Sequence, residues 1–191
     1  MRELLVGEGK RGDLLLASLE LFSTRGYDRV SVRDIAKQAG VSEAALYKHF
    51  AGKEELALYI FRIIIGEYTR QVREVVQQGG SAIERLIHVQ KLTYNLYQAD
   101  EMSIRFALLS QYQFWDLVDD EIKPHFLLRQ LLAEGMTNRE IPKRPVYLWI
   151  SLYSGLMLEP LIQYPFFGDE FPDWEEFSSQ VGKSIGRILS A

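Results

Sequence analysis

The chain has 191 residues, of which 47% are hydrophobic and 25% are charged, a composition typical of globular rather than disordered proteins. It contains no cysteine, which excludes disulfides, thiolate metal sites and cysteine nucleophiles. The net charge of −4 by itself argues against nucleic acid as a partner.

The distribution of charge changes that interpretation. Residues 1–53 carry nine Lys/Arg against seven Asp/Glu, whereas residues 54–191 carry thirteen against nineteen. A weakly basic head on an acidic body permits local binding of phosphates by the head. The N-terminus lacks the apolar core of a signal peptide, and the apolar run 56–65 is far shorter than the ~20 residues of a membrane span. A cytoplasmic protein with no membrane partner is therefore expected.

Apolar residues recur at helical spacing along the chain, which predicts an all-α fold. The expected helices are a first one that ends at Gly26, then 32–39, 43–50, 53–78, 82–99, 101–115, 124–136, 146–163 and 174–189. Pro160 is expected to kink the eighth or end it early, and residues 164–173 are expected to form a loop. Two domains are predicted, 1–53 and 54–191, with the long helix from Lys53 joining them.

Residues 31–50, SVRDIAKQAGVSEAALYKHF, read as two short helices joined by a tight turn. Ser31 and Ser42 are typical N-caps, and Gly40 can adopt the left-handed conformation that a sharp turn requires. A small core between the helices can be formed by Ile35, Ala36, Ala39, Val41, Leu46 and Phe50. This pattern predicts a helix-turn-helix motif, whose second helix enters the major groove of DNA.

The outward face of that second helix suits DNA. Ala44 and Ala45 allow the backbone to approach the groove, and their methyl groups can contact thymine. Tyr47, Lys48 and His49 can donate hydrogen bonds to phosphates. A plain helical hairpin with a solvated face remains the alternative, but the caps, the glycine and the inward residues all favour the DNA-binding motif.

The stretch LFSTRGYDRVSVRDIAKQAGVSEAALYKHFAGKEELA, residues 21–57, resembles the TetR/AcrR family of transcriptional regulators. By position, the resemblance implies DNA contacts by Ser31, Arg33, Glu43, Ala44, Ala45, Tyr47, Lys48, His49 and Lys53. It also implies a homodimer that places two heads on half-sites of a double-stranded operator, about one turn (~34 Å) or a multiple of it apart. Ala44-Ala45 departs from the small polar pair common in the family, which leaves Arg33, Glu43 and Lys48 as the main polar readers.

The body holds 19 of the 23 aromatic residues. Any one of them is more often core than ligand contact, but together they exceed the needs of one core and predict an apolar pocket. In the family the ligand lies among helices four to eight. The candidate lining residues are Phe61, Tyr68, His88, Leu92, Phe106, Leu109, Gln111, Tyr112, Trp115, Trp149 and Tyr153. The apolar bias predicts an organic, aromatic or lipid-like effector.

The last two helices are expected to form the dimer interface, as in the family. Ser178, Gly182 and Gly186 are four residues apart and would allow close helix approach. The full candidate set is Leu152, Leu156, Ser178, Val181, Gly182, Ile185, Gly186 and Leu189. The alternative is that this small-residue face packs inside its own subunit.

Enzymatic readings find little support. The GKS at 182–184 lacks the glycine of a phosphate-binding loop, since Phe177 stands at that place. Glu121 and His125 lack the second histidine of a metal site. No enzyme, metal or cofactor is expected. The sequence predicts a ligand-responsive repressor that binds operator DNA as a dimer. An activator of the same family, and an all-α ligand-binding or interaction protein with vestigial DNA binding, are the alternatives.

Overall fold

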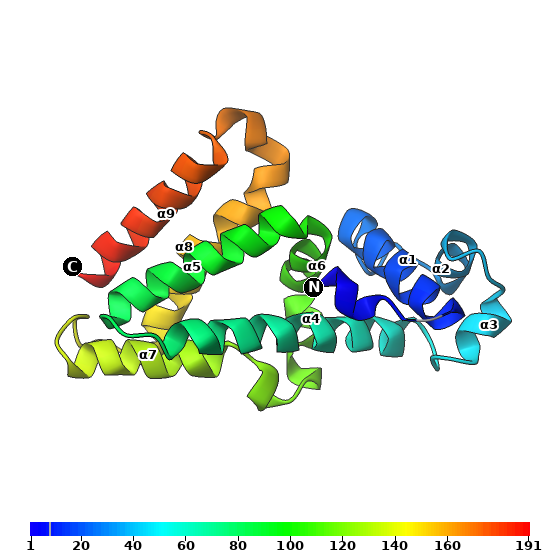
Figure 1. Cartoon of the computed structure of the whole chain (residues 1–191), viewed down its shortest axis with the longest axis horizontal. Helices are drawn as coiled ribbons and strands as arrows, with labels where there is room; N and C mark the ends of the chain where they lie inside the picture. Colours follow the sequence, from blue (N-terminus) through cyan, green and yellow to red (C-terminus); the bar gives the residue numbers. More distant parts are fainter. Residues whose placement is uncertain (8) are drawn as a thin grey trace. The chain divides into compact units, whose positions relative to one another are not determined.

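The computed structural model describes residues 1–7 and 9–191, and the regular elements within these ranges are helices (Figure 1). The predicted all-α fold with an N-terminal helix-turn-helix head is confirmed. In chain order the helices are η1 (Arg2–Leu5), α1 (Lys10–Arg25), α2 (Val32–Gln38), α3 (Glu43–Tyr47), α4 (Lys53–Val76), α5 (Ala82–Ala99), α6 (Glu101–Phe114), η2 (Trp115–Leu117), η3 (Asp120–Ile122), α7 (His125–Thr137), α8 (Val146–Phe167), η4 (Gly168–Glu170) and α9 (Trp174–Leu189). No helix in the described ranges is long and apolar enough to cross a membrane.

The chain divides into two compact units. Unit 1 comprises Met1–Tyr68 and Tyr97–Ile122, and unit 2 comprises Thr69–Leu96 and Lys123–Ala191. These units differ from the predicted domains because α6 packs against α1 and so belongs with the head. The functional division at residue 53 remains a prediction.

Aromatic side chains hold unit 1 together. The rings of Phe22 on α1 and Phe106 on α6 stack with centroids 5.7 Å apart. Phe61 on α4 lies 6.4 Å from Phe106 and 5.7 Å from Phe114, centroid to centroid. All four side chains are at most 1% exposed. Burial of aromatic rings at these distances is a large stabilising contribution, so the core ties α1, α4 and α6 into one body.

Asp100 fixes the start of α6 in unit 1. Its carboxylate accepts hydrogen bonds from the Ser103 backbone N–H (3.3 Å), the Ser103 hydroxyl (2.7 Å) and the Arg2 backbone N–H (2.7 Å). Burial acts to raise the pKa of Asp100, but these hydrogen bonds outweigh it and hold the pKa below its ordinary value. The ionised carboxylate thereby caps α6 and anchors the N-terminal segment.

In unit 2, buried aromatic side chains on α8 and α5 use their polar ends to bond the backbone. Trp149 Nε1 donates to the Pro142 carbonyl (3.0 Å), and the Tyr153 hydroxyl donates to the Leu86 carbonyl (2.8 Å). The Tyr94 hydroxyl donates to the Met157 carbonyl (3.2 Å). Buried tyrosine and tryptophan usually find such partners, so these bonds explain how large side chains with polar groups fit the core.

Helix α8 is longer than expected. It continues through Pro160 and Pro165 to Phe167. Of the two expectations for Pro160, a kink or an early end, the early end is wrong, and so is the loop expected at residues 164–167. A proline removes one backbone donor, but packing sustains the later turns: the Tyr164 ring lies 5.5 Å from Phe177 and 5.1 Å from Trp174, centroid to centroid.

Arg139 occupies a left-handed backbone conformation, with φ 62°, immediately after α7. The N–H of Glu140 donates to the Gly135 carbonyl (2.9 Å) and that of Arg139 to the Met136 carbonyl (3.3 Å), the bonding pattern in which glycine is usual. We therefore expect Arg139→Gly to raise the free energy of unfolding by about 0.5–1 kcal/mol, because glycine adopts positive φ without strain.

Urea unfolding of Arg139→Gly and of Lys143→Gly provides the measurement. Lys143 lies in the same connector, but its φ is not positive, so its replacement is expected to lower stability slightly. Equal destabilisation by both substitutions would contradict the interpretation.

Candidate nucleic-acid interface

A reciprocal cap starts α2. Ser31 Oγ accepts from the Asp34 N–H (3.1 Å), while Asp34 Oδ2 accepts from the Ser31 N–H (2.9 Å) and from the Ser31 hydroxyl (2.5 Å). Hydrogen bonds from the Ser31 side chain and then its backbone hold the pKa of Asp34 below its ordinary value. The hydroxyl proton of Ser31 is thus engaged inside the cap, so donation to a DNA phosphate would require that bond to open.

The turn between α2 and α3 has the geometry expected of Gly40. Its φ is 66°, and the Val41 N–H donates to the Ala36 carbonyl (2.9 Å) while the Gly40 N–H donates to the Lys37 carbonyl (3.2 Å). These are the two bonds of a Schellman motif. Ser42 Oγ then accepts from the Ala45 N–H (3.2 Å) and caps α3. Helix α3 ends at Tyr47 rather than at the predicted Phe50.

Gly40→Ala is expected to lower the free energy of unfolding by about 1–2 kcal/mol, the cost of a Cβ in a left-handed conformation. Among the described residues other than its two chain neighbours, none has an atom within 4 Å of the position that a Cβ would occupy, so the cost comes from the backbone alone. Gly52→Ala is the matched control, because its surroundings are equally open and its φ is not positive.

Chemical unfolding followed by circular dichroism measures both Gly40→Ala and Gly52→Ala. A Gly40→Ala protein as stable as the Gly52→Ala protein would show that the turn does not need glycine.

The outward face of α3 is formed around two buried anchors. Leu46 is 0% and Phe50 4% exposed, whereas Tyr47 is 56% exposed. The other expected DNA contacts on α3 and its following turn, Glu43, Ala44, Ala45, Lys48 and His49, are exposed except for half-buried Ala45. Arg33 is also exposed, on the first turn of α2. The helix therefore presents acceptor, donor and apolar groups to solvent side by side, as direct readout of bases requires.

Lys53 has a partner that sequence reasoning missed. Its ammonium donates to the Tyr27 carbonyl (3.0 Å) and lies 4.0 Å from the centroid of the Tyr27 ring. Desolvation by burial, with the charges of Glu54 and Asp28, raises the pKa of Tyr27. An ammonium has three donors, so Lys53 retains donors for a phosphate while its position is held by Tyr27. No sequence signal links residues 27 and 53.

The expected effector residues are distributed over both units. Phe61, Tyr68, Phe106, Leu109, Gln111, Tyr112 and Trp115 belong to unit 1, and His88, Leu92, Trp149 and Tyr153 to unit 2. Phe61 and Phe106 belong to the aromatic core of unit 1. Tyr112 is 94% and Leu109 52% exposed, and His88 is also exposed. These three side chains therefore reach solvent, and their place in an effector pocket remains a prediction.

The small-residue face of α9 packs inside its own subunit, which is the alternative that the sequence left open. A Cβ on Gly182 would lie 3.0 Å from Gln90 Oε1, and one on Gly186 would lie 3.4 Å from Ile87 Cδ1. Gln90 Nε2 donates to the Ser178 carbonyl (3.2 Å) and hydroxyl (3.1 Å). The expected interface role is corrected for Ser178, Gly182, Ile185, Gly186 and Leu189, which the structure places against or toward the interior of unit 2.

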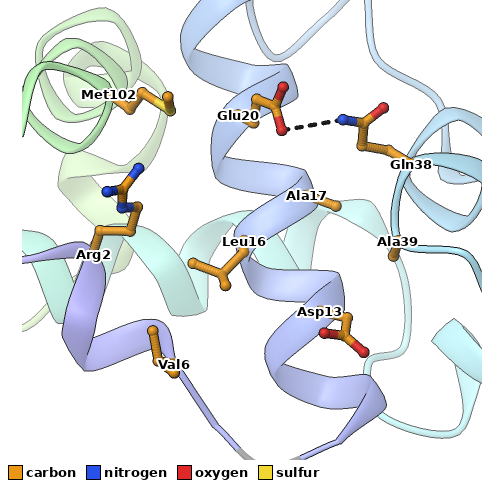
Figure 2. A pocket seen from close by; sticks show the side chains of 9 residues that line it. All are labelled: Arg2, Val6, Asp13, Leu16, Ala17, Glu20, Gln38, Ala39 and Met102. Atoms are coloured by element: carbon orange, nitrogen blue, oxygen red, sulfur yellow. Dashed lines mark hydrogen bonds between the residues drawn. The ribbon is translucent and has the colours of Figure 1, made fainter.

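Unit 1 also contains a cavity of about 390 Å³ behind the helix-turn-helix (Figure 2). Its walls are Arg2, Val6, Asp13, Leu16, Ala17, Glu20, Gln38, Ala39 and Met102. Figure 2 shows Gln38 at the end of α2 donating to the Glu20 carboxylate on α1 (3.1 Å). None of the expected effector residues lines this cavity. Its walls come from distant parts of the sequence, so no local pattern could have predicted it.

The chain resembles known bacterial regulatory proteins in sequence. Residues 14–60 match the family model described as bacterial regulatory proteins, tetR family. The fatty acid metabolism regulator protein of Bacillus subtilis (strain 168) is 26% identical over 130 residues, or 65% of this chain and 67% of that protein. The HTH-type transcriptional repressor KstR2 of Mycobacterium tuberculosis is 36% identical over 77 residues, which is 40% of this chain and 38% of that protein. The HTH-type transcriptional activator FasR of Mycolicibacterium smegmatis is 30% identical over 103 residues, which is 54% of this chain and 47% of that protein. The chain spans less than half the length of the last two.

Solved structures share the fold over nearly the whole chain. The transcriptional regulator FadR from Bacillus subtilis, in complex with stearoyl-CoA, aligns with a TM-score of 0.76 at 23% identity over 93% of this chain and 98% of that one. A tetR-family regulatory protein from Rhodococcus RHA1 aligns with a TM-score of 0.78 at 16% identity, over 97% of this chain and 99% of that one. At these identities the likeness concerns the fold alone.

Proposed function

We propose, because the chain belongs to the TetR family of DNA-binding transcriptional regulators, that it represses its target genes as a cytoplasmic homodimer on a palindromic operator and is released by a small apolar effector. The observation that carries the proposal is the exposure of Tyr47, at the end of α3, and of Lys48 and His49, which follow it, next to the buried anchor Leu46. The outward face of α3, with its following turn, has the donors and the close backbone approach that the major groove requires.

The proposed contacts are of two kinds, contacts to base edges and contacts to the sugar-phosphate backbone. Arg33, Glu43 and Lys48 are the polar candidates for base edges, with Ala44 and Ala45 contacting thymine methyl groups. The candidates for the sugar-phosphate backbone are Ser31, Tyr47, His49 and Lys53. Contacts of the first kind set specificity, and contacts of the second kind set register and the salt dependence of binding.

The proposed dimer surface is the outer face of α8 with the outer edge of α9. Leu148 is 44%, Leu152 37% and, on α9, Ile188 38% exposed, and Leu156 and Val181 are half-buried. A helix that is apolar on all faces is normally buried on all faces, so the exposed apolar residues of α8 favour a second subunit. Of the set expected from sequence, Leu152, Leu156 and Val181 remain in this proposal.

The proposed effector carries a long acyl chain. The aromatic-rich body and the apolar bias of the expected pocket support an apolar ligand. The FadR relative of the same fold was solved with stearoyl-CoA, and a relative in sequence is named a fatty acid metabolism regulator. An acyl thioester is therefore the effector class that we propose for this chain.

The test measures the binding of labelled DNA flanking the gene of this protein by fluorescence anisotropy, with and without stearoyl-CoA, coenzyme A or stearate. The expected result is specific binding that stearoyl-CoA weakens at least ~10-fold, which corresponds to a coupling free energy of about 1.4 kcal/mol. Analytical ultracentrifugation should show a dimer. Tighter binding with stearoyl-CoA would overturn release by effector, and failure to select any sequence from random DNA would overturn the repressor proposal.

A further inference from the structure

Unit 2 contains a basic groove between α5 and α9 that neither the proposed DNA contacts nor the expected effector residues explain. Its volume is about 590 Å³, and its cations are Lys91 on α5 with Lys183 and Arg187 on α9. The rest of the lining is Ile87, Ser179, Gly182, Gly186 and Ser190, so none of the described residues that line the groove is acidic. The proposed DNA contacts all belong to unit 1.

The three cations of the basic groove have no anionic partner within the described residues 1–7 and 9–191, because no ion pair or hydrogen bond engages their side chains. Two other cations of unit 2 are paired: Arg85 bonds Glu134 and Arg70 bonds Glu74. Three unpaired like charges repel one another, and in a chain of net charge −4 their concentration at one place is a marked local excess. An external anion would remove that repulsion.

A second basic cavity adjoins the groove. It measures about 760 Å³, includes Arg139, Lys143 and Arg144, and shares Ser190 with the groove. Its one acidic lining residue is Glu140, whose carboxylate accepts from the Ala82 N–H (2.5 Å) and is thus already engaged. Arg139 has a left-handed backbone conformation, which glycine would adopt without strain. The presence of an arginine at this position despite the strain favours a role for its side chain.

Interaction with the helix dipole explains the position of only some of these cations. Cations in the last turn of a helix stabilise its C-terminal dipole, and Arg187 lies in the last turn of α9. Lys91 lies in the middle of α5, and Lys143 and Arg144 lie on the connector between α7 and α8. The helix dipole therefore gives no reason for these three cations.

We propose that the basic groove binds a small anion bearing more than one phosphate group, of nucleotide size or less. Lysine and arginine are the usual partners of phosphate oxygens, and the Ser179 and Ser190 hydroxyls add donors beside them. The volume falls within the ~300–1,000 Å³ of small-molecule sites. Such an anion has two sources, the bisphosphate nucleotide end of a coenzyme A thioester or a free polyphosphate. The proposal goes beyond the repressor assignment and holds whichever effector releases the DNA.

The test is isothermal titration of the full-length protein, free of DNA, with adenosine 3′,5′-bisphosphate and with pyrophosphate at physiological salt. The variants are Lys91→Gln/Lys183→Gln/Arg187→Gln and the charge-preserving Lys91→Arg/Lys183→Arg. The control is Arg129→Gln, which removes a cation of unit 2 that lines neither cavity. Thermal melting of each variant establishes that it is folded.

We expect the triple glutamine variant to bind at least ~10-fold more weakly, because it removes the three cations that would form charge-assisted hydrogen bonds with the phosphates. The charge-preserving and control variants should bind like the native protein. Preference for the bisphosphate assigns the nucleotide source, and equal binding of pyrophosphate assigns the free polyphosphate source. Absence of binding to the native protein would overturn the proposal, as would equal binding by the folded triple variant. The proposal also fails if the triple variant keeps phosphate binding and loses DNA binding instead.

Discussion

Replacing Tyr47 and Lys48 together by alanine is expected to lower the affinity for operator DNA at least ~100-fold, since each specific contact contributes about 1–3 kcal/mol. The slope of log affinity against log salt should become shallower by about one unit, because the charge of Lys48 no longer displaces counterions from the DNA, whichever group the side chain contacts. The free energy of unfolding should be unchanged, because Tyr47 is 56% exposed and Lys48 is also exposed.

Anisotropy titration across a salt series measures this effect. Tyr112→Ala serves as the control, because Tyr112 is a more exposed tyrosine of unit 1, at 94%, outside the helix-turn-helix. If the double variant kept its salt-dependent, specific affinity, α3 would not be the reading helix, and the interaction-protein alternative would gain support.

Phe61→Ala is expected to lower the free energy of unfolding by about 3–5 kcal/mol, the usual cost of a large cavity in a core. Phe61 is 0% exposed and packs against Phe106 and Phe114. The same substitution decides between two roles, because Phe61 was also a candidate to line the effector pocket. A side chain facing an open pocket would leave little new cavity on removal.

Guanidinium unfolding measures the loss, with Phe61→Leu as the more conservative variant, expected to cost less than Phe61→Ala because it leaves a smaller cavity. Phe167→Ala is the exposed control, because Phe167 is 54% exposed. A Phe61→Ala protein of nearly native stability that no longer responds to stearoyl-CoA would assign Phe61 to the pocket instead.

The helix-turn-helix could be predicted from sequence because its determinants are local. Ser31, Gly40 and Ser42 act on backbone groups within five residues of themselves, and Leu46 and Phe50 meet the core through helical spacing. The last residues of α3 were misplaced because helix ends depend on the geometry of the following turn, in which the His49 N–H bonds the Leu46 carbonyl (2.9 Å). The persistence of α8 past Pro160 depends on aromatic packing from α9, which no local rule contains.

The all-α fold, the helix-turn-helix and the class of regulator could be inferred from the amino-acid sequence, because caps, turns and apolar periodicity act over a few residues. Contacts between residues far apart in the sequence, in contrast, became visible in the folded chain. The glycines of α9 signal close approach to a helix, but the sequence does not say that the helix is α5 of the same chain. Likewise Lys53 meets Tyr27, and cations separated by about a hundred residues gather in one groove. Contacts of this kind depend on the fold of the whole chain, which cannot be derived from local sequence patterns.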